Sequence, residues 1–280
     1  MTMSHISGAS SSSAPPEQRD RRQVMVRLAR APGLLPLVTL VSILIVWEVS
    51  CQVFAIPSFV LPSPTRILGG FGAIPFPRWL DHIWSTLRVA LIGYVVSIVI
   101  AIPTAVMLTR SEMLSRALYP ILVVIQATPV VAVAPVIIVA LGSGDLPRVV
   151  ITFLITFFPL VVSTTTGLLA TPPELIELSR SLRAPAIREM TQIRLPFAIP
   201  YVFSALKISI TLAVIGAVVA EFVAADKGIG YYIQFSTSMF QVQQAWAGLV
   251  VLVAISLALF QLVAAAQRIW FPWSIPSERS

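Results

Sequence analysis

Six apolar runs of membrane-spanning length constrain what this sequence of 280 residues can fold into. The runs lie at about 34–54, 84–109, 117–141, 147–169, 199–223 and 244–268. A helix rises about 1.5 Å per residue, so each run is long enough to cross roughly 30 Å of hydrocarbon. Only 11% of the residues are charged, against about 25% in soluble domains. The sequence therefore predicts an all-α integral membrane protein with six transmembrane helices.

Basic residues between these runs predict the orientation of the chain. If the N-terminus is cytoplasmic, thirteen basic residues lie on the inner side and five on the outer side. Since cytoplasmic loops carry an excess of Lys and Arg, both termini are predicted to be cytoplasmic. The net charge of +7 thus reflects membrane topology, and we exclude a nucleic-acid partner because the arginines form no stripe on a soluble face.

Composition also predicts the domain boundaries. Residues 1–33 are polar, with runs of serine and several arginines, and are predicted to be a disordered cytoplasmic tail. Residues 34–271 form the six-span domain, and residues 272–280 a cytoplasmic C-terminal tail. The single cysteine, Cys51, excludes an internal disulfide framework and a multi-thiolate metal site, so we interpret it as a membrane-buried thiol.

The loop between the fourth and fifth runs combines apolar and basic residues. Thr171-Pro172-Pro173 ends one helix and begins another, and Pro185 interrupts the new one. One flank is apolar and the rest largely basic: Leu175, Ile176, Leu178 and Leu182 against Arg180, Arg183 and Arg188. Pro196 and Pro200 predict a second break before the fifth span. We expect a short amphipathic segment at the cytoplasmic surface, although such segments can also rest on lipid headgroups.

Spacing in this loop resembles a known family signature. Glu177, Ile193 and Leu195-Pro196 match the EAA motif of permease subunits in binding-protein-dependent ABC importers, between spans four and five. Leu178 and Ser179 replace the two alanines of the motif, and Arg183 replaces its glycine. The resemblance implies a type I importer permease fold and a coupling loop at 171–196 that docks on an ATPase. The ATPase-contacting residues would be Glu177, Leu178, Ser179, Arg183, Ile193, Leu195 and Pro196.

Other stretches narrow the resemblance to one branch. They are similar to nitrate, taurine and aliphatic-sulfonate permeases: residues 61–65, 126–129, 220–222 and 228–230. This branch implies a nitrate-, sulfonate- or taurine-like anion or a small heteroaromatic or aromatic acid as solute, and a bacterial inner membrane. It also implies a permease homodimer, a dimer of ABC ATPases, and a substrate-binding protein that docks outside near 55–83 and 224–243. ATP and Mg²⁺ would bind to the ATPase, and this chain would hold no cofactor and no metal.

Catalytic motifs are missing from the sequence. Neither Lys207 nor Lys227 is followed by Ser or Thr, so there is no Walker A loop, and His5 and His82 lack metal-ligand spacing. We therefore predict a non-enzymatic subunit. An ATP-independent secondary transporter remains an alternative, but the inverted repeats typical of that class are not evident. A membrane-embedded enzyme is disfavoured because the spans lack paired acids or a Ser/His set.

Polar residues inside the spans are candidates for the solute path. Gln126 and Thr128 precede Pro129, which frees a backbone carbonyl, and Glu221 follows a run of small residues. Each could instead form hydrogen bonds between helices. Three further charged residues have simpler expectations: snorkelling or helix-end pairing for Arg88, contact with headgroups for Lys207, and a partner within the bundle for Glu48.

Overall fold

The computed structural model describes residues 34–275, and all regular structure in that range is helical. The predicted tail at 1–33 and the last five residues of the predicted C-terminal tail lie outside the described range. The elements are α2 (Leu34–Val53), α3 (Pro64–Gly70), η1 (Phe71–Ala73), α4 (Phe76–Arg110), α5 (Glu112–Ala127), α6 (Val130–Leu141), α7 (Asp145–Leu169), α8 (Pro173–Ser181), α9 (Ala186–Arg188), η2 (Glu189–Arg194), α10 (Leu195–Ala224), α11 (Ile229–Ser238), α12 (Val242–Trp270) and η3 (Pro272–Ser274). They form two compact units that divide after Thr65.

The first unit is built on α2 and the turn that follows it. The Glu48 carboxylate accepts hydrogen bonds from the Thr65 backbone N–H at 3.0 Å, the Thr65 hydroxyl at 2.8 Å and the Gln52 amide at 2.8 Å. Thr65 lies in the first turn of α3, whose N–H groups have no partner within the helix. The hydrogen-bond partners of Glu48 thus lie in its own unit, at Gln52 and Thr65, whereas we predicted a partner within the bundle. Cys51 is buried, as expected.

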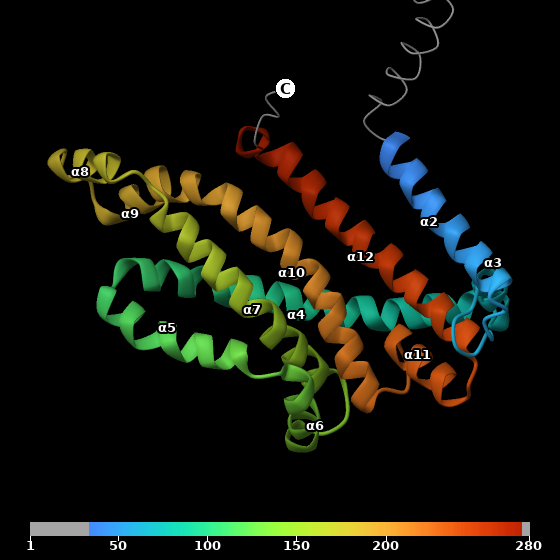
Figure 1. Cartoon of the computed structure of the whole chain (residues 1–280). Coiled ribbons are helices and arrows are strands. Elements are labelled where there is room, and N and C mark those ends of the chain that lie inside the picture. The colour runs from blue at the N-terminus through green and yellow to red at the C-terminus, as the bar shows by residue number, and fades with distance from the viewer. Residues whose placement is uncertain (1–33, 276–280) are drawn as a thin grey trace, which may run out of the picture. The chain divides into compact units, whose positions relative to one another are not determined.

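The second unit is centred on α4, α7 and α10, which pack closely through small and hydroxyl-bearing residues. A Cβ atom on Gly93 would overlap the side chain of Thr152, and one on Gly216 would lie 2.9 Å from the Thr152 Cα. The hydroxyls of Ser97 and Thr156 contact each other across α4 and α7. Small residues let membrane helices approach closely enough for such contacts. Figure 1 shows α8 and α9 at one end of α7 and α10, and α11 at the other.

Five single helices are long and apolar enough to span a membrane, and one bent pair raises the number to six. The bent pair is the predicted span at 117–141, which divides into α5 and α6 with a bend of 94°. The bend follows from Pro129, which has no N–H to donate and disfavours a helical conformation at Thr128. The Thr128 hydroxyl donates instead to the Val124 carbonyl, at 3.0 Å. The third span is thus not the straight helix that hydropathy predicts.

Two other predicted boundaries differ from the structure. Helix α4 begins at Phe76, eight residues earlier than predicted, because the polar residues of its first two turns lower the local hydropathy. The predicted break before the fifth span is wrong, since the helix continues from Ala186 through Ala224. Pro196 comes shortly after a π-helical turn at Glu189–Arg194, and this local change in the hydrogen-bond pattern accommodates a residue that has no N–H to donate.

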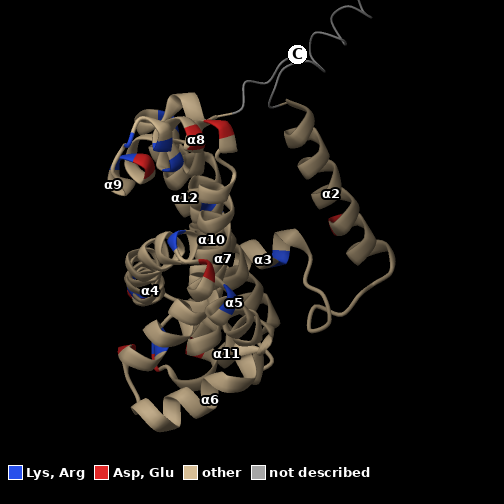
Figure 2. Cartoon of the chain, turned by 90° about the vertical axis from the view of Figure 1, so that its left-hand side faces the viewer, with Lys and Arg blue, Asp and Glu red and all other residues tan. Residues whose placement is uncertain are grey.

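Charged residues are concentrated outside the long helices. Figure 2 shows Lys, Arg, Asp and Glu gathered around α8 and α9, whereas most of the ribbon of the long helices is uncharged. The main exceptions lie near the other end of α7 and α10. These two charged regions, at opposite ends of α10, are the candidate functional sites.

Candidate functional site

The coupling-loop candidate begins with α8, which ends in a Schellman motif. The Ala184 N–H donates to the Ser179 carbonyl at 3.0 Å, and the Arg183 N–H donates to the Arg180 carbonyl at 2.9 Å. Arg183 has φ = +54°, the left-handed conformation that this position requires. Glycine adopts that conformation without strain, which explains physically why the motif carries glycine here. The loop of this chain adopts the left-handed conformation here although an arginine occupies the position.

The predicted motif residues divide into an exposed and a buried set. Glu177 is exposed and Leu178 is 56% exposed, whereas Ser179 is 5% exposed. The Ser179 hydroxyl has no hydrogen-bond partner among the described residues. Because the side chain at position 179 is buried, only a small residue fits there. Of the remaining predicted residues, Arg183 and Leu195 are exposed, and Ile193 and Pro196 are half-buried.

Glu189, which we did not predict, joins the parts of the loop. Its carboxylate accepts a 2.8 Å hydrogen bond from Arg194 Nε and lies 3.9 Å from Arg180 Nε. The side chains of Glu189 and Arg194 are only 15% and 13% exposed, so this ion pair is largely shielded from water. This shielded pair lies within the π turn that leads into α10, and the longer contact from Arg180, whose side chain is 71% exposed, links the turn to the end of α8. The one signal in the sequence was an acidic residue among four arginines.

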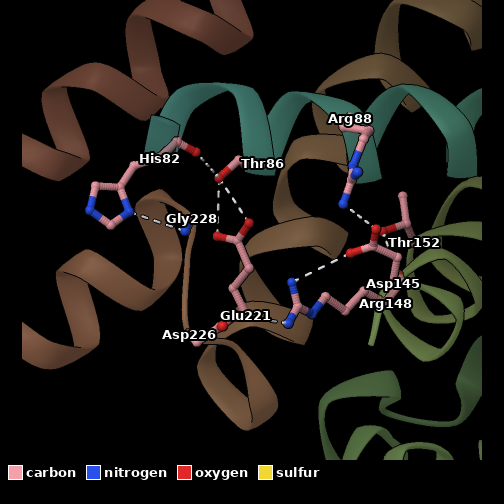
Figure 3. A network of polar contacts seen from close by, with 9 residues as sticks. All are labelled: His82, Thr86, Arg88, Asp145, Arg148, Thr152, Glu221, Asp226 and Gly228. Carbon is pink, nitrogen blue, oxygen red and sulfur yellow. Dashed lines mark hydrogen bonds and ion pairs between the residues drawn. The ribbon is translucent and has the colours of Figure 1, made fainter. Parts of the chain in front are cut away.

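At the opposite end of α10, Glu221 is fully buried in a polar network (Figure 3). The Thr86 hydroxyl donates to the Glu221 carboxylate at 2.9 Å and accepts from the Ile229 N–H at 2.8 Å. The Gly230 N–H donates to the same carboxylate at 2.7 Å. Ile229 and Gly230 form the first turn of α11, whose N–H groups lack helical partners and whose dipole favours a carboxylate. Glu221 and Thr86 therefore cap α11 and attach it to α4 and α10.

Two glycines permit this arrangement. Gly228 has φ = +125°, and a Cβ on it would collide with the Glu221 carboxylate. A Cβ on Gly230 would lie 2.8 Å from Glu221 Oε2 and 3.0 Å from the Val218 carbonyl. The Gly228 N–H also donates to His82 Nδ1 at 3.2 Å. The Ala-Glu-Phe and Gly-x-Gly stretches thus form one structural element, with the carboxylate packed against glycine backbone.

Ion pairs continue the network beside Glu221. Arg88 pairs with Asp145 at the start of α7, so of its two expected roles the structure shows pairing and not snorkelling. Arg148, whose side chain is 9% exposed, lies 3.7 Å from the Asp145 carboxylate and 3.8 Å from that of Asp226. We assigned Arg148 only to an outer loop. The signal in the sequence was the presence of Asp145 and Asp226 at the ends of two different spans, where they could serve as partners for a buried arginine.

The three candidates for the solute path do not form one site. Gln126 and Thr128 are exposed at the bend between α5 and α6, whereas Glu221 is buried in the network. Both Glu221 oxygens accept hydrogen bonds within the chain, so the geometry favours the alternative role, hydrogen bonding between helices. Within residues 34–275, no three His, Cys, Asp or Glu side chains gather as a metal site would need.

Aromatic packing also holds α11 in place. Tyr232 packs edge-on against Trp79, with ring centroids 4.8 Å apart, and Gly248 approaches it from α12. Burial raises the pKa of the Tyr232 phenol, which therefore stays neutral. The capped first turn and this aromatic contact hold α11 in a defined position against α4 and α12.

Comparison with known proteins then settles the family. Residues 93–273 match the binding-protein-dependent transport system inner membrane component family. The chain belongs to this family. The permease is 34% identical to a riboflavin transport permease of Chloroflexus aurantiacus over 86% of this chain and 91% of that protein. It is 30% identical to a formylaminopyrimidine transport permease of Halalkalibacterium halodurans over 86% and 96% of the two chains.

Nitrate and aliphatic-sulfonate permeases also match this permease, at 26% and 24% identity. The predicted family is therefore confirmed. Among solved structures, the permease resembles the inward-facing MetNI methionine ABC transporter, with a TM-score of 0.62 and 21% identity. That similarity covers 70% of this chain and 99% of the other, and it supports the all-α membrane fold. The chain is an importer permease whose multi-pass helices confirm the predicted fold class.

Proposed function

We propose that residues 171–196 dock onto a separate ABC ATPase and thereby couple ATP hydrolysis to solute import through this permease. The observation that supports the proposal is the group of exposed apolar side chains on α8 and α9. Leu178 and Leu182 are 56% and 73% exposed outside the candidate spans, and Ile187, 62% exposed, lies at the very start of the span Ala186–Ala224. Large apolar side chains gathered on a charged surface mark a contact with another molecule.

The charged residues around this apolar surface indicate which charges the groove of the partner must carry. Glu174 and Glu177 occupy the N-terminal half of α8, and Arg183 and Arg188 follow its C-terminal end. All four are exposed. A partner groove would therefore need an apolar floor, basic groups facing the start of α8 and acidic groups facing its end.

The loop is built to transmit movement. Glu189 bridges Arg180 of α8 and Arg194 of the π turn, and the π turn continues into α10 without a break. Displacement of α8 by the ATPase would therefore move α10, since only the four residues 182–185 separate α8 from the helix that continues into α10, and the Arg180–Glu189 contact spans them. In this mechanism the chain itself binds no ATP, and ATP and Mg²⁺ belong to the partner.

The remaining assignments complete the proposal. The α8 end of the bundle faces the cytoplasm of a bacterial inner membrane, with both termini on that side. Two copies of the permease form the pathway, and a substrate-binding protein docks at the opposite side, near 55–83 and 224–243. The solute is a small nitrate-, sulfonate- or taurine-like anion or a small heteroaromatic or aromatic acid. Relatives named for both kinds of solute support this range.

Co-purification with the ATPase encoded beside the gene tests this proposal. We expect Glu177→Arg to reduce recovery of the ATPase at least about tenfold, because like charges across an interface cost more than 1.4 kcal/mol. Glu112→Arg is the matched control: Glu112 is 80% exposed and lies outside the motif. Equal losses in both variants would show a general charge effect. If no ATPase associates with the wild type, the docking assignment fails and an ATP-independent transporter becomes the better account.

A further inference from the structure

A hollow of about 420 Å³ lies at the end of α10, beside α11. It is lined by Phe222 from α10 and by residues of α11: Ile233, Gln234, Thr237 and Ser238. Its volume falls within the range of small-molecule sites. Phe222 is 40% exposed, so part of its ring surface is available to a ligand.

The polar groups in this hollow are mostly acceptors. The Thr237 hydroxyl donates to the Ile233 carbonyl, and the Ser238 hydroxyl donates to the Phe235 carbonyl, each at 2.8 Å. Their hydrogens are thus committed, and only oxygen lone pairs face a ligand. Gln234 is exposed and forms no side-chain hydrogen bond within the described range, so its amide offers both donors and an acceptor. This combination matches a ring edge that carries N–H and carbonyl or ring-nitrogen groups.

The lining of this hollow carries no positive charge. None of its lining residues is charged, and the nearest arginines of the polar network already have acidic partners. Arg88 pairs with Asp145, and Arg148 lies between Asp145 and Asp226. An inorganic anion would therefore meet hydroxyl oxygens without a compensating cation, an unfavourable environment for a charge.

A second hollow of about 710 Å³ continues from the first along α10 and α12. Phe222 lines both hollows, and the second is bounded almost entirely by apolar side chains, such as Val218, Val253 and Phe260. A neutral, planar aromatic solute could pass from the first hollow, which contains the Gln234 amide, into this apolar groove, because it carries no charge that needs a counter-ion. The neighbouring Glu221, held by Thr86 and Gly230, fixes the backbone that presents Phe222.

We propose that the hollow between α10 and α11 is a solute subsite for neutral, planar heteroaromatic compounds, with Phe222 stacking on the ring and Gln234 bonding its edge. This inference rests on the proposed function in that it assumes a solute carried along this chain. It narrows that function by excluding nitrate-like and sulfonate-like anions from the subsite. Relatives named for riboflavin and formylaminopyrimidine transport are consistent with this chemical class.

Direct binding to the purified full-length permease in lipid nanodiscs tests the inference. The probes are riboflavin and cytosine, which are both uncharged near neutral pH, and binding is measured by equilibrium dialysis. We expect saturable binding of at least one probe. Stacking on an aromatic side chain contributes about 1–3 kcal/mol, so Phe222→Ala is expected to weaken binding about 5- to 150-fold. Gln234→Leu should weaken it about fivefold or more.

Matched controls keep the result interpretable. Phe235→Ala removes an aromatic ring from α11 that is 45% exposed and does not line the hollow. Gln241→Leu removes an exposed amide beyond the end of α11. Both are expected to bind like the wild type, and all variants should keep its elution profile and thermal midpoint.

Three outcomes would overturn the subsite. The first is failure of both probes to bind the wild type. The second is that the Phe222→Ala and Gln234→Leu variants bind a probe as tightly as the wild type does. The third is displacement of a bound probe by nitrate or taurine. None of these outcomes depends on the ATPase, because the permease is tested alone. An intact ATPase interaction with failed probe binding would leave the coupling proposal standing and reject only the subsite.

Discussion

The two ends of α10 use the same kinds of charged residue in opposite ways. In the 171–196 loop, Glu177 and Arg183 are exposed, and neither has an ion pair or side-chain hydrogen bond within the described part of the chain. In the network beside α11, Glu221 is fully buried, and its oxygens accept from Thr86 and Gly230. A carboxylate with free lone pairs at the surface is available to a partner, whereas one enclosed by donors holds helices together.

This contrast extends to the glycine positions. Arg183 occupies a left-handed position at a surface turn, where the side chain points into open solvent and the strain is small. Gly228 occupies a positive-φ position against a buried carboxylate, where no side chain fits. The loop therefore tolerates a departure from its motif, and the network does not. Substitutions at these positions should differ in stability effect by several kcal/mol.

The largest expected effect comes from Gly228→Ala. A Cβ would collide with Glu221 and the backbone would be strained, so we expect a loss of about 4 kcal/mol in unfolding free energy. The measurement is the thermal midpoint in detergent by intrinsic fluorescence. Gly144→Ala is the matched control, since Gly144 has φ = +145° but nothing within 4 Å of its Cβ position. Equal losses would show that backbone strain alone is responsible.

Removal of the carboxylate should have the next largest effect. Glu221→Ala leaves the Gly230 N–H and the Thr86 hydroxyl without their acceptor, for an expected loss of about 3 kcal/mol. Glu221→Gln keeps one acceptor oxygen and should lose less. Glu177→Ala, at the exposed end, should change the thermal midpoint by no more than the equivalent of about 0.5 kcal/mol. A comparable loss for Glu177→Ala would contradict the contrast between the two ends.

Arg183→Gly should stabilise the loop. Glycine removes the left-handed strain at the Schellman position, for a gain of about 1 kcal/mol in local stability. Hydrogen exchange of the α8 amides would report the gain as slower exchange. Arg180→Gly, within α8, should do the reverse by a similar amount, because glycine is unfavourable inside a helix. Faster exchange in both variants would argue that the Arg183 side chain itself stabilises the loop.

The smallest expected effect is that of Ser179→Ala. The Ser179 hydroxyl is buried without a partner, so its removal should be neutral or stabilising by up to about 0.5 kcal/mol. Ser97→Ala provides the comparison, because the Ser97 hydroxyl donates to the Gly93 carbonyl at 2.9 Å and contacts Thr156. That variant should lose about 1 kcal/mol in the same thermal assay. A clear loss for Ser179→Ala would indicate a hydrogen bond that forms only with a partner.

Much of the fold was predictable, and the errors have local causes. Apolar length located the spans, but not the 94° bend at Pro129 or the polar first turns of α4. The prediction of a helix break at Pro196 was also wrong, because the π-helical turn before it accommodates the missing N–H. Glu189 and Arg148 were missed because their roles depend on partners in other helices or turns. Sequence spacing proposed the loop residues but did not separate buried Ser179 from exposed Glu177.

The sequence by itself determined that this chain spans a membrane and belongs among importer permeases, because hydrophobic length and the spacing of a loop motif are local properties. Only the tertiary structure decided what Glu221 does. Its hydrogen bond to Thr86 joins residues 135 positions apart, and it exists because α4, α10 and α11 pack at one end of the bundle. A carboxylate in an apolar run is ambiguous in sequence, since its energy depends on the donors that packing brings to it.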